Sequence, residues 1–290
     1  MMIIAYKGDI VFTPSPDHFE TFEDGYVLVE DGKVIRVCDS LPPDSRNITI
    51  MNRSGHLIIP AFNDLHTHAP QYPLAGLGFD YELLPWLEKY TFKAESRYAD
   101  IDMADHWYRR FITKLWENGT LRFSAFATLH NEATLRLMEL CQESGLRPVI
   151  GKVNMDRNSP DYLIEDTDAS LSGTEELIMK AKKITPDVGF IITPRFVPST
   201  TPELMNGLGE LAKRYHLPVQ SHLDENRNEI KWVHELHPNI PTYTEVYEHY
   251  GLCPMDARSW PIVSGLPTGN ERSLRSMTYG SRTALNPTWT

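Results

Sequence analysis

Short apolar runs alternate with helical patterns from residue 57 onward, and this alternation restricts the possible folds most strongly. Repeated strand-then-helix units, spaced roughly 25–45 residues apart, favour parallel strands joined by crossover helices. Nearly continuous apolar runs such as 188–192 are typical of a sheet covered on both faces. We therefore expect an α/β protein. The predicted strands are 57–65, 121–128, 147–153, 188–196 and 218–223, and the predicted helices are 102–118, 131–144, 175–184, 202–215 and 225–236.

Five such units are visible, whereas a closed (β/α)8 barrel has eight and about 250 residues. Residues 1–58 are rich in Ile, Val and Tyr and predict a separate small β domain. Within it, Asp31-Gly32 between two apolar runs is a strong hairpin signal. We therefore predict a small N-terminal β domain over 1–58, followed by an incomplete (β/α) barrel of about five units over 59–254.

The last segment, residues 255–290, differs in composition from the rest. It contains four Arg, no Lys, no His and two acidic residues, and it shows neither helical nor strand periodicity. We expect this tail to lie outside the preceding fold, as the product of a frameshift, alternative splicing or a gene-model error. A natural basic tail is the alternative.

The charge balance and the cysteines limit the partners and the compartment. The formal net charge of −11 argues against nucleic acid and anionic membranes as partners. Three widely spaced cysteines suggest no disulfide framework and favour a reducing compartment. The N-terminus lacks a signal-peptide pattern, and no run approaches the length of a membrane span. We expect a cytoplasmic protein.

The strongest candidate for chemistry is the apolar run 58–68, which ends in His66-Thr67-His68. Alternate residues of a strand project to the same face, so both imidazoles can reach one zinc ion at about 2.0–2.1 Å. The C-terminal ends of barrel strands are also where active sites form. A His-x-His pair alone is a weak signal, but its place at the end of a strand that follows a small β domain favours a metal site.

Two further strand ends carry candidate residues. His222 closes the run 218–223, and Glu225 follows at the start of the next helical pattern, which suits a metal ligand beside a proton carrier. The alternative is a strand-end histidine with a glutamate favoured by the helix dipole. Arg195 ends another strand and suits a polar planar ligand, with a surface ion pair as the alternative. This strand end lacks a Lys or Glu to bridge two metals, which favours a single ion.

At these residues the chain resembles the amidohydrolase superfamily and, within it, the guanine deaminase family. The matching segments follow the family order from the N-terminus to about residue 254. The segments 151–156 and 193–196 separate this family from general cytosine and adenosine aminohydrolases. The matching segments are 60–72, 87–95, 126–130, 151–158, 193–196, 220–226 and 243–247.

The resemblance implies a zinc hydrolase, with one Zn²⁺ per subunit, that converts guanine and water to xanthine and ammonia. It also implies a homodimer. In such an enzyme the zinc makes hydroxide available near neutral pH. The resemblance assigns the zinc ligands His66, His68 and His222, the purine-binding residues Gln71, Arg195 and Phe196, and the catalytic proton carrier Glu225.

The sequence departs from the family pattern after residue 254. The family also has a histidine ligand after the sixth strand and an aspartate after the eighth that acts as general base. No histidine follows His249, and the only later aspartate is Asp256. We therefore expect a truncated chain with little or no deaminase activity. Two alternatives remain open: another purine or pterin aminohydrolase, and an inactive fragment that binds a homologous subunit or purines without chemistry.

Overall fold

The Asp31-Gly32 turn closes a β-hairpin, as the sequence predicts. Strands β2 (His18–Glu30) and β3 (Lys33–Cys38) pair antiparallel and are separated by these two residues alone. Both turn residues have positive φ, 48° at Asp31 and 77° at Gly32, as the mirror-image turns of tight hairpins require.

The computed structural model describes residues 2–43, 47–253 and 262–263. It divides the chain into two compact units between Ala61 and Phe62. The first unit is a four-stranded sheet with the order β3-β2-β1-β4, in which β1 (Ile3–Ser15) pairs parallel with β4 (Ile48–Ile58). Its small core is formed by the buried side chains of Ala5, Leu28 and Cys38.

Parallel strands form the sheet of the second unit. Their bounds are β5 (Phe62–His68), β6 (Thr120–Phe126), β7 (Val149–Gly151), β8 (Val153–Asn154), β9 (Gly189–Phe190), β10 (Thr193–Pro194) and β11 (Ser221–His222). The hydrogen-bonded order is β5-β6-β7-β9, β8 pairs with β10, and a parallel bridge joins Ile192 to Val219 just before β11. The strands thus follow one another in chain order. The predicted α/β class, an incomplete (β/α) barrel with a small N-terminal β domain, is confirmed.

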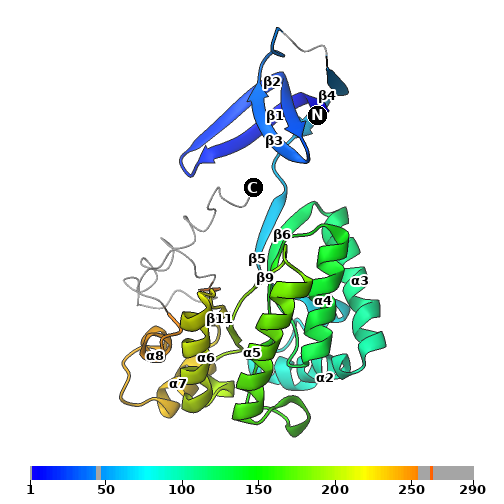
Figure 1. The fold of residues 1–290 in the computed structure, drawn as a ribbon. Coiled ribbons are helices and arrows are strands. Elements are labelled where there is room, and N and C mark those ends of the chain that lie inside the picture. Colours follow the sequence, from blue (N-terminus) through cyan, green and yellow to red (C-terminus); the bar gives the residue numbers. More distant parts are fainter. Residues whose placement is uncertain (1, 44–46, 254–261, 264–290) are drawn as a thin grey trace. The chain divides into compact units, whose positions relative to one another are not determined.

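Helices follow the strands and pack against one another in chain order, with α3 on α4, α4 on α5 and α5 on α6 (Figure 1). The bounds of the longer helices are α3 (Ile101–Glu117), α4 (Asn131–Ser144), α5 (Thr167–Ile184), α6 (Pro202–Tyr215), α7 (Arg227–Leu236) and α8 (Tyr243–His249). Within the described part of the chain, no helix combines the length and the apolar character that crossing a membrane demands.

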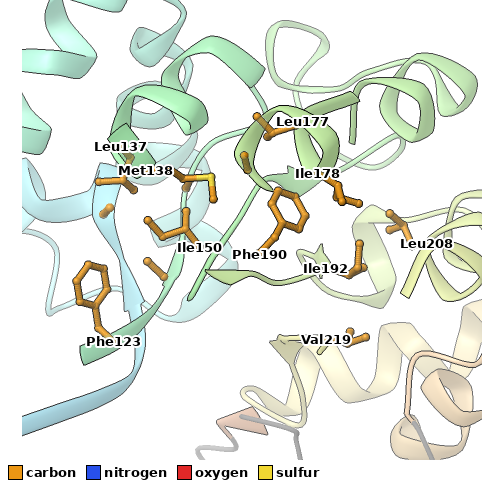
Figure 2. Close-up of a cluster of buried hydrophobic side chains, with 14 of the residues drawn as sticks. Phe123, Leu137, Met138, Ile150, Leu177, Ile178, Phe190, Ile192, Leu208 and Val219 are labelled. Atoms are coloured by element: carbon orange, nitrogen blue, oxygen red, sulfur yellow. The ribbon is translucent and has the colours of Figure 1, made fainter. Parts of the chain in front are cut away.

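The core of the second unit lies between its strands and these helices. Figure 2 shows Phe123, Ile150 and Phe190 from the strands beside Leu137 of α4 and Leu177 of α5. All five side chains are less than one-tenth exposed. Burying such apolar side chains supplies most of the stabilisation of the fold and fixes the strand ends at which polar side chains emerge.

Several sequence-based boundaries differ from the structure. The predicted strands 147–153 and 188–196 each divide into two short strands, β7 with β8 and β9 with β10. The predicted strand 57–65 is wrong, because β4 ends at Ile58 and β5 begins at Phe62; Pro60 lies between them and has no N–H for a ladder. Helix α5 begins eight residues before the predicted 175, in a polar stretch without apolar periodicity. The short helices of residues 69–99 and α8 were not predicted. They are η1 (Ala69–Leu74), α1 (Leu83–Trp86), η2 (Leu87–Thr91), α2 (Phe92–Ser96) and η3 (Arg97–Ala99).

The tail prediction concerns residues 255–290, and most of them lie outside the described residues. The described pair Ile262–Val263 forms strand β12, which pairs parallel with β11. That the remaining tail lies outside the preceding fold stays a prediction.

Candidate active site

One cavity of about 230 Å³ in the second unit brings the predicted site residues together. They come from the carboxyl ends of β5, β10 and β11 and from the segment that follows each strand. Side chains at the carboxyl ends of parallel strands meet at one edge of a sheet, which explains the convergence of residues so far apart in sequence. All seven line the cavity: His66, His68, Gln71, Arg195, Phe196, His222 and Glu225.

Three histidines form a tight cluster in the cavity wall. One ring nitrogen from each of His66, His68 and His222 lies within 4.8 Å of the others, and the Nε2 atoms of His68 and His222 are 3.0 Å apart. The buried Phe126 ring lies beneath them, with its centroid 4.4 Å from His68 and 4.6 Å from His222. This apolar support fixes the orientation of both imidazoles.

The register of β5 against β6 directs the two histidines of the His-x-His pair. Asp64 pairs with Phe123 and Thr67 with Ala125, so three steps along β5 match two along β6. The extra residue is a β-bulge, a distortion that re-aims side chains beside active sites.

The protonation state of the His222 ring follows from its contact with a backbone carbonyl. Its Nδ1 lies 2.7 Å from the carbonyl oxygen of Arg195. A carbonyl only accepts, so Nδ1 carries the proton and donates, and Nε2 keeps its lone pair toward the cluster. Burial, with a smaller contribution from His66, lowers the pKa of His222 to about 3, and burial also lowers the pKa of His68 well below its ordinary value. Both imidazoles are therefore neutral at pH 7, the form that binds metals.

The histidine cluster fits a zinc ion. Two ligands of a tetrahedral zinc with bonds of about 2.0–2.1 Å lie roughly 3.3 Å apart, close to the 3.0 Å between the Nε2 atoms of His68 and His222. One ring nitrogen from each of the three histidines also makes up a donor set that suits zinc.

A second group of residues holds the polar side of the cavity. Arg195 is 2% exposed and forms a two-pronged ion pair with Glu95, at 2.5 Å from Nη1 to Oε2 and 3.2 Å from Nη2 to Oε1. Gln71 donates from Nε2 to Oε1 of the same carboxylate at 2.9 Å. The guanidinium also lies 5.3 Å from the centroid of the Phe92 ring. Gln71 and Arg195 are thus held in fixed orientations at the cavity wall.

Glu225, predicted from the sequence as the proton carrier, lies between β11 and α7. The residue is exposed, yet the surrounding atoms desolvate its carboxyl and raise its pKa, against the opposing effect of the Arg195 cation. Its backbone N–H donates to Oε2 of Glu229 at 2.9 Å, and that of Asn226 donates to the same oxygen at 3.0 Å. The hydroxyl of Tyr243 donates to Oε1 at 2.8 Å. Glu229 therefore ties the loop that carries Glu225 to the start of α7.

Glu229 makes the stability of this loop depend on pH. Burial raises its pKa from 4.5 to about 7. The folded state then binds the proton of Glu229 more tightly than the unfolded state, so protonation stabilises the fold. This stabilisation is fully present below pH 4.5 and is lost as the pH rises through 7. Between pH 5 and pH 8 we expect the wild type to lose at most about 3 kcal/mol of unfolding free energy through Glu229. Glu229→Gln is expected to lack this loss.

The measurement is urea unfolding of wild type and Glu229→Gln at both pH values. Glu235→Gln, an exposed change on the same helix, is the matched control. If wild type and Glu229→Gln lose the same stability between the two pH values, the raised pKa of Glu229 is wrong.

Sequence reasoning missed two kinds of residue at this site. The first is the buried pair of carboxylates, Glu95 and Glu229, whose partners become visible only in the folded chain. A capping-box pattern, Asn226 followed by Glu229, was available as a signal for the second of them. The other kind is the apolar side of the cavity, formed by Leu83, Trp86 and Leu87.

Comparison with known proteins gives a family for most of the second unit. A model of the amidohydrolase family matches residues 57–256. A guanine deaminase from Dictyostelium discoideum is 44% identical over 87% of this chain and 60% of its own length. A human guanine deaminase is 41% identical over 85% of this chain and 57% of its own length.

A solved structure is similar to this chain over most of its length. The crystal structure of a guanine deaminase from C. acetobutylicum, with guanine bound in its active site, superposes with a TM-score of 0.90 at 42% identity. The match covers 96% of this chain and 66% of that one. This chain therefore spans less than two thirds of the length of each of these relatives.

Proposed function

Because this chain belongs to the amidohydrolase family, we propose that its cavity is the zinc and purine site of a guanine deaminase, which hydrolyses guanine to xanthine and ammonia. One observation carries the proposal: three clustered histidines with lowered pKa values and a fixed Gln71–Arg195 pair line the same cavity of about 230 Å³. The names of the relatives, guanine deaminase in each case, support the choice of purine.

In this proposal His66, His68 and His222 hold a single zinc ion. When bound, zinc supplies a hydroxide nucleophile near neutral pH by lowering the pKa of water. The imidazoles need no deprotonation to accept the ion at pH 7, because burial lowers the pKa of all three.

The other side chains orient the purine and move protons. Gln71 and Arg195 hydrogen-bond its polar edge, and the buried Phe196 closes one side of the cavity. Trp86 and Leu87 add apolar surface that excludes water and strengthens those hydrogen bonds. Glu225, whose raised pKa keeps a larger share of its carboxyl protonated, donates to the ring nitrogen and then assists the departure of ammonia.

We expect turnover by the 290-residue polypeptide alone to be weak. Among the residues that the structure describes, the cavity wall contains one carboxylate, Glu225, and no aspartate. A positioned general base contributes about 10²–10⁴-fold to such a reaction. Guanine binding is therefore expected to persist where catalysis is impaired.

The test combines binding and turnover on the zinc-loaded chain. Guanine is expected to quench the tryptophan fluorescence in a saturable way, with Trp86 as the reporter in the cavity wall. Conversion to xanthine, followed by ultraviolet absorbance, is expected to be at least about 100-fold slower than with the Dictyostelium enzyme assayed alongside. Absence of guanine binding would overturn the proposed function, and turnover equal to that of the relative would overturn the expected impairment.

A further inference from the structure

Glu95 has no part in the chemistry proposed above, although it contacts the purine side of the cavity. It lies on α2 (Phe92–Ser96), is 1% exposed and does not line the cavity itself. Its carboxylate binds two residues that do line it, Gln71 and Arg195. A buried carboxylate is retained at low cost only when it is fully paired, and Glu95 is paired with these two side chains.

We propose that Glu95 is a positioning residue that sets the hydrogen-bonding polarity of the purine pocket and thereby selects guanine over adenine. The inference rests on the proposed function and adds a determinant of specificity to it. Its basis is the set of three hydrogen bonds that the Glu95 carboxylate accepts.

The first step concerns the amide of Gln71. Oε1 of Glu95 lies 2.9 Å from Nε2 of Gln71. An ionised carboxylate only accepts hydrogen bonds, so the amide must direct its NH₂ group toward Glu95. The amide oxygen, on the other arm of the planar group, is then left to accept a hydrogen bond from a ligand. Without the carboxylate, the amide could turn and offer a donor instead.

The second step concerns the guanidinium of Arg195. Glu95 takes one N–H from each terminal nitrogen of Arg195, which leaves three of the five donors for other partners. The planar ion pair and the Phe92 ring, three residues before Glu95 on the same helix, fix the plane of the guanidinium. The ion pair also cancels the charge of Arg195, so the pocket suits a neutral purine.

Together these contacts give the pocket an acceptor at Gln71 beside donors at Arg195. Guanine offers the complement, a ring N–H beside the carbonyl oxygen O6. Adenine offers the opposite pattern, an amino donor beside a ring nitrogen acceptor. A site built to hydrogen-bond one pattern rejects the other strongly, because its own polar groups are then left unpaired. Glu95 thus determines the preference without touching the purine.

Glu95→Gln tests the inference, with Glu88→Gln, the same change at an exposed position of the adjoining η2 (Leu87–Thr91), as matched control. The dissociation constants of guanine and adenine are measured by fluorescence on the zinc-loaded full chain. We expect Glu95→Gln to weaken guanine binding at least about tenfold and to change adenine binding by less than about threefold. Equal losses for both purines, or no loss for guanine, would overturn the inference.

Glu95→Asp covers the case in which Glu95→Gln fails to fold, and it separates orientation from bulk structure. It keeps the charge but shortens the side chain, so we expect a folded protein whose guanine affinity lies between those of wild type and Glu95→Gln. Unchanged selectivity in a folded Glu95→Asp, with the glutamine variant unfolded, would assign Glu95 a structural role only. A wild-type chain that binds neither purine would overturn the proposed function itself, whereas wild-type binding with no change in the variants would overturn this inference alone.

Discussion

Zinc affinity is expected to fall by at least about 100-fold when His222 is replaced by alanine. Loss of a residue that merely orients a metal ligand already costs about 10–100-fold, and in the proposed zinc site His222 supplies a ligand nitrogen itself. Its Nδ1 is fixed on the carbonyl of Arg195, and its Nε2 lies 3.0 Å from Nε2 of His68. The variant therefore loses the best-oriented donor of the cluster.

The affinity is measured by competition with a coloured chelator, and His234→Ala provides the control. His234 lies exposed on α7, so its replacement is expected to leave the zinc affinity unchanged. Thermal unfolding of both metal-free variants checks that each is folded. Zinc binding of folded His222→Ala with wild-type affinity would show that the metal site lies elsewhere.

Arg195→Ala is the second change with a large expected effect, because it leaves the Glu95 carboxylate buried without its cation. Breaking a buried pair from one side costs about 3–5 kcal/mol of unfolding free energy. Arg214→Ala is the matched control: Arg214 pairs with Glu175 at 2.8 Å, but at an exposed position, where such pairs contribute about 0–1 kcal/mol. Urea unfolding compares the two variants, and equal losses would contradict the buried pairing.

A double variant separates stability from recognition at this position. Glu95→Gln combined with Arg195→Met removes both charges, so we expect the stability to recover in part. Guanine binding is not expected to recover, because the donors of Arg195 are still missing. A double variant that binds guanine as wild type does would remove Arg195 from the purine site.

The histidine cluster was predictable because its signals are local. His66, His68 and His222 each end an apolar run, and parallel strands place their carboxyl ends at one edge of the sheet. Hydrophobic residues at helical spacing likewise predicted α4 and α6 with the same bounds that the structure shows. For these elements, the residues that determine the structure lie within the element itself.

The contacts that Glu95 makes with the residues of the cavity wall were not predictable in this way. Glu95 pairs with Arg195 across 100 residues of sequence and lies on a helix of five residues, too short to show a period. The start of α5 was missed for a related reason, since its first residues are polar and are held by the Asp166 cap. The prediction of one strand over 57–65 was wrong because the apolar pattern continues past Pro60. The hydrogen-bond ladder does not continue there, since proline has no N–H to donate.

A crystal structure of the zinc-loaded chain grown with guanine, recorded at the zinc absorption edge, tests the central claim most directly. We predict an anomalous peak about 2.0–2.1 Å from a nitrogen of each of His66, His68 and His222. Guanine is predicted in the same cavity, within hydrogen-bond distance of Gln71 and Arg195. Zinc held by other residues, or guanine bound outside this cavity, would contradict the account.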